Sequence, residues 1–190
     1  MHVSMHFLTG WLTANAAQLS PRERALVTVA GILPDFDGLG AIAEVATKGT
    51  QHPLLWWSHY HHLFGHNLLC GICFTVVAFA LSTRRWLTAF LALLAFHLHL
   101  LEDVIGARGP DGDQWPIPYF WPFSKAYPWA WDGQWALNAW PNFLLMSIML
   151  TATLYLATIR GYSPLEMVST RADQAFVKTL QRRFAPHRLN

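Results

Sequence analysis

Charged residues are scarce in this sequence. Asp, Glu, Lys and Arg together make up 13% of the 190 residues, whereas apolar residues make up 53%. An ordinary soluble domain carries roughly 25% charged residues, so this composition argues against one. Ten tryptophans point the same way, because tryptophan favours the membrane–water interface. The composition therefore indicates a protein in contact with lipid.

Cysteine is also rare, and the two that occur, Cys70 and Cys73, form a CxxC pair. Such a pair can serve redox chemistry or bind zinc, but this one lies inside an apolar run and has no second pair. We interpret both residues as small side chains that pack in a membrane helix, and we expect no disulfide. The first residues show no basic region followed by a small-residue cleavage site, so we expect no cleavable signal peptide and insertion through internal spans.

Long apolar runs are present instead. Three of them cover residues 68–82, 86–101 and 143–159, and each is close to the lower limit of about 17 residues for a spanning helix. Two shorter runs, residues 7–17 and 25–34, are interpreted as short spans, a re-entrant pair or buried helices. The pattern predicts an all-α integral membrane helical bundle with about five embedded helices. The alternative is a soluble helical protein with very apolar core helices.

Basic residues concentrate in three segments that separate or follow the apolar runs. These segments are residues 20–24, residues 82–85 and the stretch from residue 160 onward. The other connections are mainly acidic. Because cytoplasmic loops are enriched in Lys and Arg, we expect the basic segments inside and the acidic ones outside. The N-terminus would then lie outside and the C-terminus in the cytoplasm.

The last part of the chain predicts an amphipathic helix. Ser163 is a candidate N-cap, Pro164 suits the first helical position, and Glu166 completes a capping box. We therefore divide the chain into a membrane-embedded domain, residues 1–162, and a basic tail, residues 163–190. The tail helix either lies on an anionic cytoplasmic leaflet or packs on the protein's own inner loops.

Histidines and carboxylates gather in three short clusters at the edges of apolar runs. The clusters are residues 34–37, residues 59–66 and residues 97–103. Imidazole and carboxylate are ligand types that zinc, manganese and iron accept, and ionisable groups beside apolar segments are energetically expensive. All three clusters fall on the predicted outer side, so we expect one metal site there. The Trp-rich loop at residues 115–140 is interpreted as an aromatic belt, a lid over the site, or both.

The third cluster has a clear helical spacing. His99 and Asp103 are four residues apart and share one face of a helix, so they can offer a nitrogen and an oxygen to one ion. Glu102 is three residues from His99 and is a candidate base behind the ligands. His97 points to another face and is interpreted as structural.

The other candidates come from the first two clusters and from the start of the chain. The predicted metal ligands are Asp35, Asp37, His61, His66, His99, Asp103 and, as a second-tier ligand, His6. His62 is held in reserve. This set exceeds what one tetrahedral zinc needs. It fits two ions bridged by a carboxylate, an arrangement that activates water and clamps a phosphoryl group.

Taken in order, these motifs resemble a known family. Four motifs are similar to those of the YdjM-like membrane-bound metal-dependent hydrolases. They are residues 34–37 (Pro-Asp-Phe-Asp), the pair His61 and His66, the pair His99 and Asp103, and residues 121–124 (Trp-Pro-Phe-Ser). The resemblance covers residues 6–124 and implies an integral protein of the bacterial inner membrane. More distantly, the pattern is similar to the zinc-dependent phospholipase C and S1/P1 nuclease group, which implies phosphoester hydrolysis.

Three residues depart from the family pattern, in which His62 would be an arginine, Gly65 a threonine and Asn67 a serine. The resemblance and the ligand set imply a membrane-bound hydrolase with one or two divalent ions, zinc first and otherwise manganese or iron. Asp37 or Glu102 would accept a proton from the attacking water. The expected substrate is a membrane lipid, a lipid-linked molecule or a small molecule, and no nucleic-acid partner is expected. The alternatives are a non-enzymatic membrane protein with a structural or sensing metal site, and a soluble hydrolase of the phospholipase C type.

Overall fold

The computed structural model describes residues 1–109 and 112–184. Every regular secondary-structure element in these residues is a helix. In these residues, extended pairing is limited to two isolated bridges, Arg108 with Ala136 and Ile117 with Trp129. The prediction of an all-α fold is therefore confirmed. The elements are α1 (Val3–Ala14), α2 (Pro21–Ile32), the 3-10 helix η1 (Pro34–Leu39), α3 (Gly40–Thr47), α4 (Trp56–Tyr60), α5 (Leu68–Leu81), α6 (Arg85–Gly106), α7 (Trp140–Arg160), the 3-10 helix η2 (Pro164–Met167) and α8 (Thr170–Phe184).

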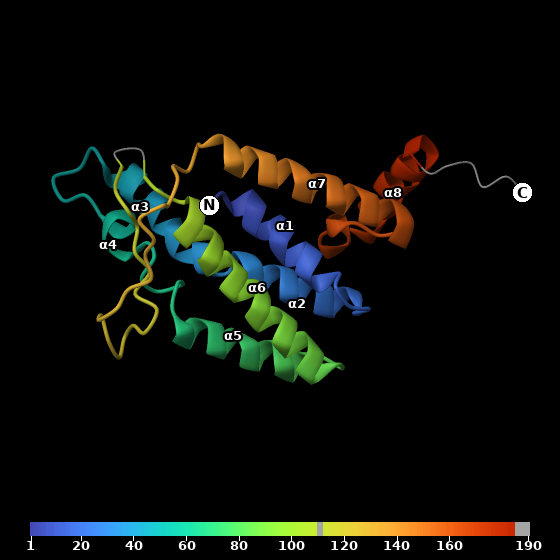
Figure 1. Ribbon diagram of the computed structural model, residues 1–190, viewed down its shortest axis with the longest axis horizontal. Helices are drawn as coiled ribbons and strands as arrows, with labels where there is room; N and C mark the ends of the chain where they lie inside the picture. The colour runs from blue at the N-terminus through green and yellow to red at the C-terminus, as the bar shows by residue number, and fades with distance from the viewer. Residues whose placement is uncertain (110–111, 185–190) are drawn as a thin grey trace, which may run out of the picture.

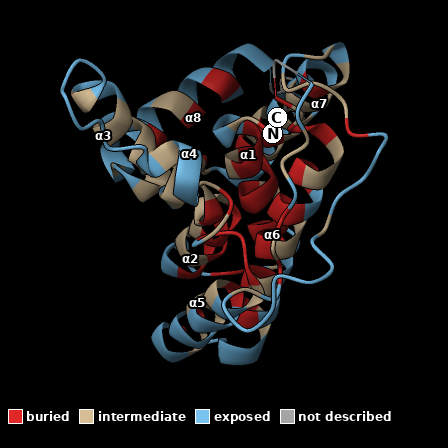
Figure 2. Ribbon diagram, turned by 90° about the vertical axis from the view of Figure 1, so that its left-hand side faces the viewer, coloured by how far each residue is buried: buried red, intermediate tan, exposed pale blue. Residues whose placement is uncertain are grey.

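The longer helices run roughly side by side along the long axis of the molecule (Figure 1). At the centre, α1, α2 and α6 pack against one another, while α5 packs against α6 and α7 against α1. The short helices α3 and α4 lie at one end, and α8 lies at the other (Figure 1). Buried residues concentrate on α1, α2 and α6 (Figure 2), and Trp11, Phe96 and Leu100 are among the largest of them.

The helices α1 and α2 cross at a point where both carry glycine. A Cβ atom on Gly10 would lie 2.8 Å from the carbonyl oxygen of Thr28, and one on Gly31 would lie 2.9 Å from the carbonyl oxygen of His6. Such close approach of two backbones requires residues without a side chain. The crossing therefore places His6 beside the C-terminal end of α2, from which residues 34–37 follow.

Local sequence explains where α2 begins and ends. Ser20 and Glu23 form a capping box at its start, and Pro21 is its first residue. Pro34 then opens η1, and the chain bends by 59° between α2 and residues 34–47. Because proline has no N–H to continue the helical hydrogen bonds, it favours a break at this point. After this bend, residues 34–37, which include Asp35 and Asp37, lie at the end of the bundle.

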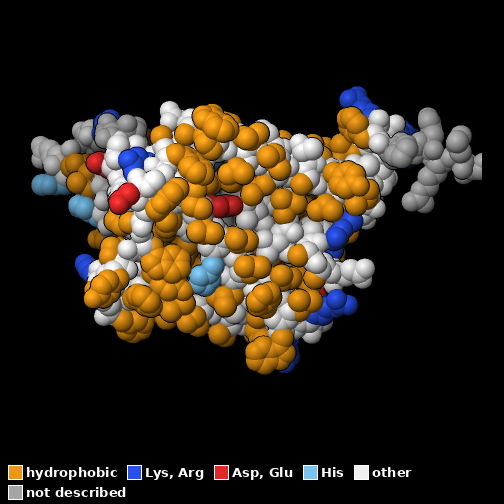
Figure 3. Space-filling model, in the orientation of Figure 1, with side chains coloured by type: hydrophobic (Ala, Val, Ile, Leu, Met, Phe, Trp, Pro, Cys, Tyr) orange, Lys and Arg blue, Asp and Glu red, His pale blue; other side chains and the backbone are white. Residues whose placement is uncertain are grey.

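Two helices, α6 and α7, are long and apolar enough to cross a membrane, and the bent pair of α2 with residues 34–47 would be a third span. α5 is apolar but has only 14 residues, and α1 has 12. Large side chains such as Val76 on α5 and Ile148 on α7 are more than half exposed. Hydrophobic side chains dominate the middle of the face in Figure 3, whereas Lys and Arg lie toward its two ends. The structure thus has two or three candidate spans.

The basic segments meet at the end opposite to α3 and α4 (Figure 1). Glu23 accepts a 2.7 Å hydrogen bond from the backbone N–H of Arg84. Arg24 donates two 2.6 Å hydrogen bonds to Glu166, and its guanidinium lies 3.7 Å from the ring centroid of Tyr162. The charge pattern predicted this gathering of basic segments at one end.

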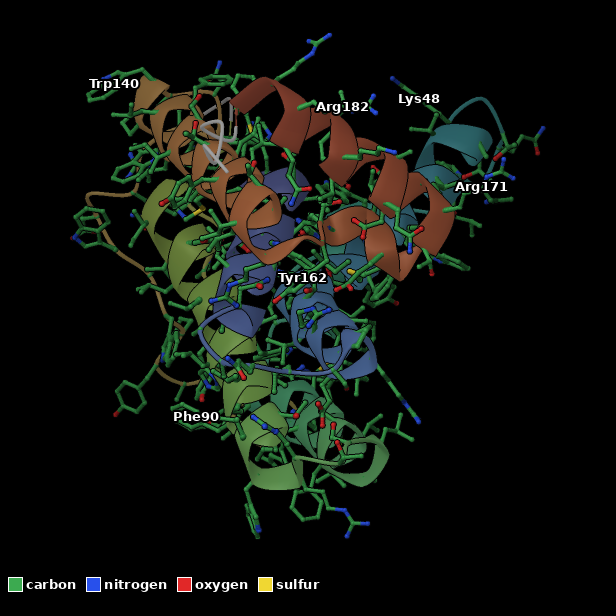
Figure 4. All side chains as sticks on the ribbon, turned by 90° about the vertical axis from the view of Figure 1, so that its right-hand side faces the viewer. Lys48, Phe90, Trp140, Tyr162, Arg171 and Arg182 are labelled. Atoms are coloured by element: carbon green, nitrogen blue, oxygen red, sulfur yellow. The ribbon has the colours of Figure 1, made fainter. Side chains whose placement is uncertain are left out.

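The tail forms two helices, η2 and α8, where the sequence predicted one. Ser163 caps η2, but Glu166 pairs with Arg24 and so does not complete the predicted capping box. α8 packs against α7 and η2. Arg171 and Arg182 remain exposed on α8 at the edge of the molecule (Figure 4).

Candidate metal centre

Three histidines from different parts of the chain each use one ring nitrogen for a supporting contact. The contacts are His6 Nδ1 to Glu102 at 2.6 Å, His66 Nδ1 to Asp37 at 3.1 Å and His99 Nδ1 to the carbonyl oxygen of Gly31 at 2.7 Å. A carbonyl oxygen only accepts, so His99 donates from Nδ1 and keeps the lone pair on Nε2. Contacts of this kind fix the orientation of a ligating imidazole.

The three remaining ring nitrogens, all Nε2, converge on Asp103. Asp103 Oδ2 lies 3.1 Å from His99 Nε2 and 3.3 Å from His66 Nε2. Asp103 Oδ1 lies 3.2 Å from His6 Nε2. Asp35 stands at the margin, with its oxygens 3.9 Å from His99 Nε2 and 4.0 Å from His6 Nε2. Atoms that each lie about 2.0–2.2 Å from one zinc ion are separated by such distances.

These side chains form two groups that share one carboxylate. In the first group, single ligand atoms of His6, Asp35, His99 and Asp103 all lie within 4.8 Å of one another. In the second group, single ligand atoms of His62, His66 and Asp103 do the same. Asp103 is therefore the carboxylate that both groups share, and it is the residue that would bridge two ions in the arrangement expected from the number of candidate ligands.

The cluster is buried, and several of its polar atoms have no hydrogen-bond partner. The rings of His6, His66 and His99 are fully buried. In the described part of the chain, the atoms without a partner include His6 Nε2, Asp35 Oδ2, His62 Nδ1 and Asp103 Oδ2. The amino nitrogen of Met1 contacts the other oxygen of Asp103. An unsatisfied buried polar group costs roughly 1–3 kcal/mol, so such a concentration of them fits a bound cation.

Asp37 and His61, both predicted as ligands, lie outside these two groups. Asp37 Oδ1 contacts His61 Nδ1 at 3.0 Å. Asp37 Oδ2 accepts the backbone N–H of Gly65 and contacts His66 Nδ1, both at 3.1 Å. Both oxygens of Asp37 are thus engaged in holding the segment that carries His66.

Glu102, predicted as a candidate base, lies behind His6. One of its oxygens contacts His6 Nδ1, and the other accepts the hydroxyl of Thr9. Sequence reasoning missed Thr9 and the carbonyl of Gly31, which supports His99. A helical hydroxyl and a backbone carbonyl carry no motif, so no pattern in the sequence marks them.

His62 has an unusual backbone and borders a cavity. Its φ of 67° lies in the left-handed region, which residues other than glycine rarely occupy. Its ring centroid is 4.2 Å from that of His61 and 4.3 Å from that of His66. A cavity of about 240 Å³ is lined by Trp57, Ser58, His61, His62, Trp115 and Pro116. Because His62 also belongs to the second ligand group, this cavity is the candidate substrate pocket.

Burial sets the protonation of two of these rings. It lowers the pKa of His62 well below 6.5, and it also lowers the pKa of His66 although contact with Asp37 opposes the change. A lowered pKa keeps the imidazole neutral at neutral pH. The neutral form is the one that binds a metal ion.

The Trp-rich loop packs against α6 beside the site. His97 Nε2 lies 2.8 Å from the hydroxyl of Tyr119, and the Tyr119 ring stacks on Trp129 with centroids 4.1 Å apart. Gln134, which no motif marks, donates a 2.8 Å hydrogen bond to the carbonyl oxygen of Asp103. His97 therefore anchors the loop, in keeping with its interpretation as structural, and the loop secures the end of α6 that carries the ligands.

Comparison with known proteins gives one match. The family described as YdjM inner membrane protein matches residues 1–176, which extends beyond the region that carries the motifs. The comparisons found no match among curated proteins or among solved structures. Because the matched region spans most of the sequence, the chain belongs to the YdjM inner membrane protein family.

Proposed function

We propose that this protein is a membrane-bound, metal-dependent hydrolase that cleaves an ester or phosphoester bond of a lipid or lipid-linked substrate. The observation that carries the proposal is the convergence of three histidine Nε2 atoms on Asp103, while each Nδ1 is held by another group. Imidazole and carboxylate donors favour zinc, with manganese or iron as alternatives. A bound divalent ion supplies Lewis acidity and brings the pKa of a water molecule near neutrality.

The carboxylates divide into ligands and supports in this proposal. Asp37 orients His66, and Glu102 orients His6, because each already holds a histidine. Asp35 is the better proton acceptor, since its side chain is 16% exposed and its Oδ2 has no partner. One Asp35 oxygen would hold an ion while the other takes the proton of the attacking water. This differs from the expectation that Asp37 or Glu102 accepts the proton.

The surroundings of the pocket support a lipid or lipid-linked substrate. Among the described residues, those that line the pocket include Trp57 and Trp115 and no Lys or Arg. Arg108, which follows the C-terminal end of α6, donates a 2.7 Å hydrogen bond to the carbonyl oxygen of Asp132. Metal ions would therefore supply most of the positive charge that a phosphoryl group requires, and the tryptophans would contact an apolar part of the substrate.

We propose that α1, α2, α5, α6 and α7 are all embedded in the inner membrane, with the metal centre at the outer face. The gathering of the basic segments at the opposite end of the bundle supports this orientation, because cytoplasmic loops are rich in Lys and Arg. The tail would then lie in the cytoplasm.

Metal analysis of purified protein tests the proposal. The wild type is expected to hold at least about one divalent ion per chain, and His99→Ala and His66→Ala are each expected to lower metal affinity by at least about tenfold. His59→Ala is the matched control, because His59 is exposed and outside both ligand groups. Elemental mass spectrometry gives the stoichiometry, and release of product from phospholipid vesicles gives the activity. Metal content that survives both substitutions unchanged would refute the proposal.

A structural metal site is the second candidate, because the ligands come from α1, η1, the segment before α5, and α6. The two functions predict different responses to a chelator. We expect metal removal to abolish ester hydrolysis while the helical circular dichroism persists, since the bundle has its own buried core. Collapse of the helical signal on chelation, with no turnover by the metal-loaded protein, would favour the structural role.

A further inference from the structure

The segment from η1 to α4, residues 34–60, forms an arm that stands away from the bundle at one end of the molecule (Figures 1 and 2). One side of this arm is apolar and uncovered. Phe36, Leu39, Ile42 and Val45 are 51%, 57%, 68% and 75% exposed. They recur at every third position, so they form one stripe along η1 and α3.

Away from this stripe, α3 packs on α4 through a polar contact and a close backbone approach. Glu44 accepts hydrogen bonds from the backbone N–H and the hydroxyl of Ser58, at 3.0 and 2.9 Å. A Cβ atom on Gly40 would lie 2.9 Å from the backbone nitrogen of Trp57, so α3 and α4 touch through their backbones. The arm is therefore one packed unit, and within the described residues nothing covers its apolar stripe.

The chemistry of the stripe points to hydrocarbon. The arm continues directly from α2, and the two together are apolar enough for a membrane span. The acidic residues of this segment turn away from the stripe: Asp35 and Asp37 contact the histidines, and Glu44 holds Ser58. From Phe36 to Val45 the exposed apolar face carries no charged side chain, and it is continuous with a candidate span; such a face fits the interfacial region of a bilayer.

We propose that the arm lies in the membrane leaflet at the metal-centre end, with Phe36, Leu39, Ile42 and Val45 against lipid acyl chains. Trp57 and Ser58, on the packed side of the arm, line the candidate substrate pocket. A lipid substrate therefore reaches the pocket along the arm, directly from the leaflet. This route rests on the proposed function, whereas the position of the arm in lipid does not.

The arm also links lipid contact to the metal centre. Within η1, Phe36 and Leu39 face outward, whereas Asp35 points to the ligand group and Asp37 supports His66. Residues that would contact lipid and residues that contact the metal centre are therefore neighbours on one short helix.

Fluorescence quenching by brominated phospholipids tests the position of the arm. A single NBD label is placed at Ile42→Cys, in a background in which Cys70→Ala and Cys73→Ala remove the native thiols, and the protein is reconstituted in nanodiscs. We expect quenching at least about twofold greater than for Thr50→Cys, because an interfacial helix buries its apolar face at the acyl boundary. Thr50 is an exposed polar residue of the same arm that lies beyond α3 and off the stripe, and Ile148→Cys on the candidate span α7 serves as the lipid-facing reference.

Two results would overturn the proposal. Water-like emission at Ile42 that bromination does not change would place the stripe in solvent. Blue-shifted emission that bromination does not quench would show that protein covers the stripe, as in a dimer of this chain. Val45→Cys repeats the measurement with an independent label. Neither readout depends on metal or turnover, so failure of the hydrolase proposal would leave this result intact.

Discussion

Asp103→Asn is expected to abolish metal binding by both ligand groups. Among the described residues, Asp103 is the one member that the two groups share. Asparagine keeps the shape of the side chain but removes the negative charge, and its amide nitrogen carries only donors. Supporting residues of metal sites typically contribute 10- to 100-fold to affinity. Loss of a bridging ligand is therefore expected to weaken binding by at least about 100-fold, which is roughly 2.7 kcal/mol.

Elemental mass spectrometry and competition with a chromogenic chelator measure this effect. Asp113→Asn is the matched control, because Asp113 is exposed and belongs to neither group. Asp35→Asn makes a second comparison, since Asp35 belongs to the first group only and its replacement should spare the second. Hydrolysis is expected to fall in parallel with metal occupancy. Wild-type stoichiometry and affinity in Asp103→Asn would rule out a bridging role.

Helical spacing accounts for the part of the site that the sequence predicted well. His99 and Asp103, four residues apart, do share a face of α6, and their ligand atoms lie 3.1 Å apart. The sidedness of charge likewise anticipated that the basic segments would gather away from the clusters. Both inferences depend on period and alternation, which are properties of the chain itself.

For the candidate ligands that lie on turns, helical spacing could not predict which residue enters a ligand group. Asp35 and Asp37 are two residues apart, but only Asp35 joins a ligand group, because the 3-10 turn after Pro34 directs them to different partners. His61 and His62 are adjacent, and the left-handed φ of His62 determines which ring enters the second group. Tertiary contacts set such backbone angles, so no spacing rule reveals them.

The sequence pattern also could not predict which of the shorter apolar runs are long enough to span a membrane. The apolar run at residues 25–34 ends where Pro34 bends the chain, yet apolar character continues into α3. Sequence alone left this region as a span, a re-entrant segment or a buried helix. The structure shows a 59° bend between α2 and residues 34–47, a geometry that fits a broken span or a re-entrant segment, and Glu44 on α3 bonds to Ser58 on α4.

Gly65→Ala is expected to damage both the fold and the metal centre. A Cβ atom at Gly65 would lie 2.1 Å from the carbonyl oxygen of Pro34 and 2.8 Å from its carbonyl carbon and Cα. All three atoms belong to the backbone, so no side-chain rotation relieves the clash. Overpacking of this kind costs about 1–3 kcal/mol. The Gly65 N–H also holds Asp37, which in turn contacts His66, so we expect metal to be lost from the second group.

The thermal unfolding midpoint and the metal content, measured in one detergent, test this prediction. A chain of this size loses roughly 2–4 °C in midpoint per kcal/mol, so a fall of several degrees is expected. Gly49→Ala is the control, because a Cβ atom there meets nothing within 4 Å. Gly65→Thr is expected to be at least as harmful, since threonine adds a hydroxyl and a methyl group beyond the Cβ atom that already meets the Pro34 backbone. Unchanged midpoint and metal content in Gly65→Ala would show that the segment around Pro34 yields without cost, and that Asp37 does not need this contact to orient His66.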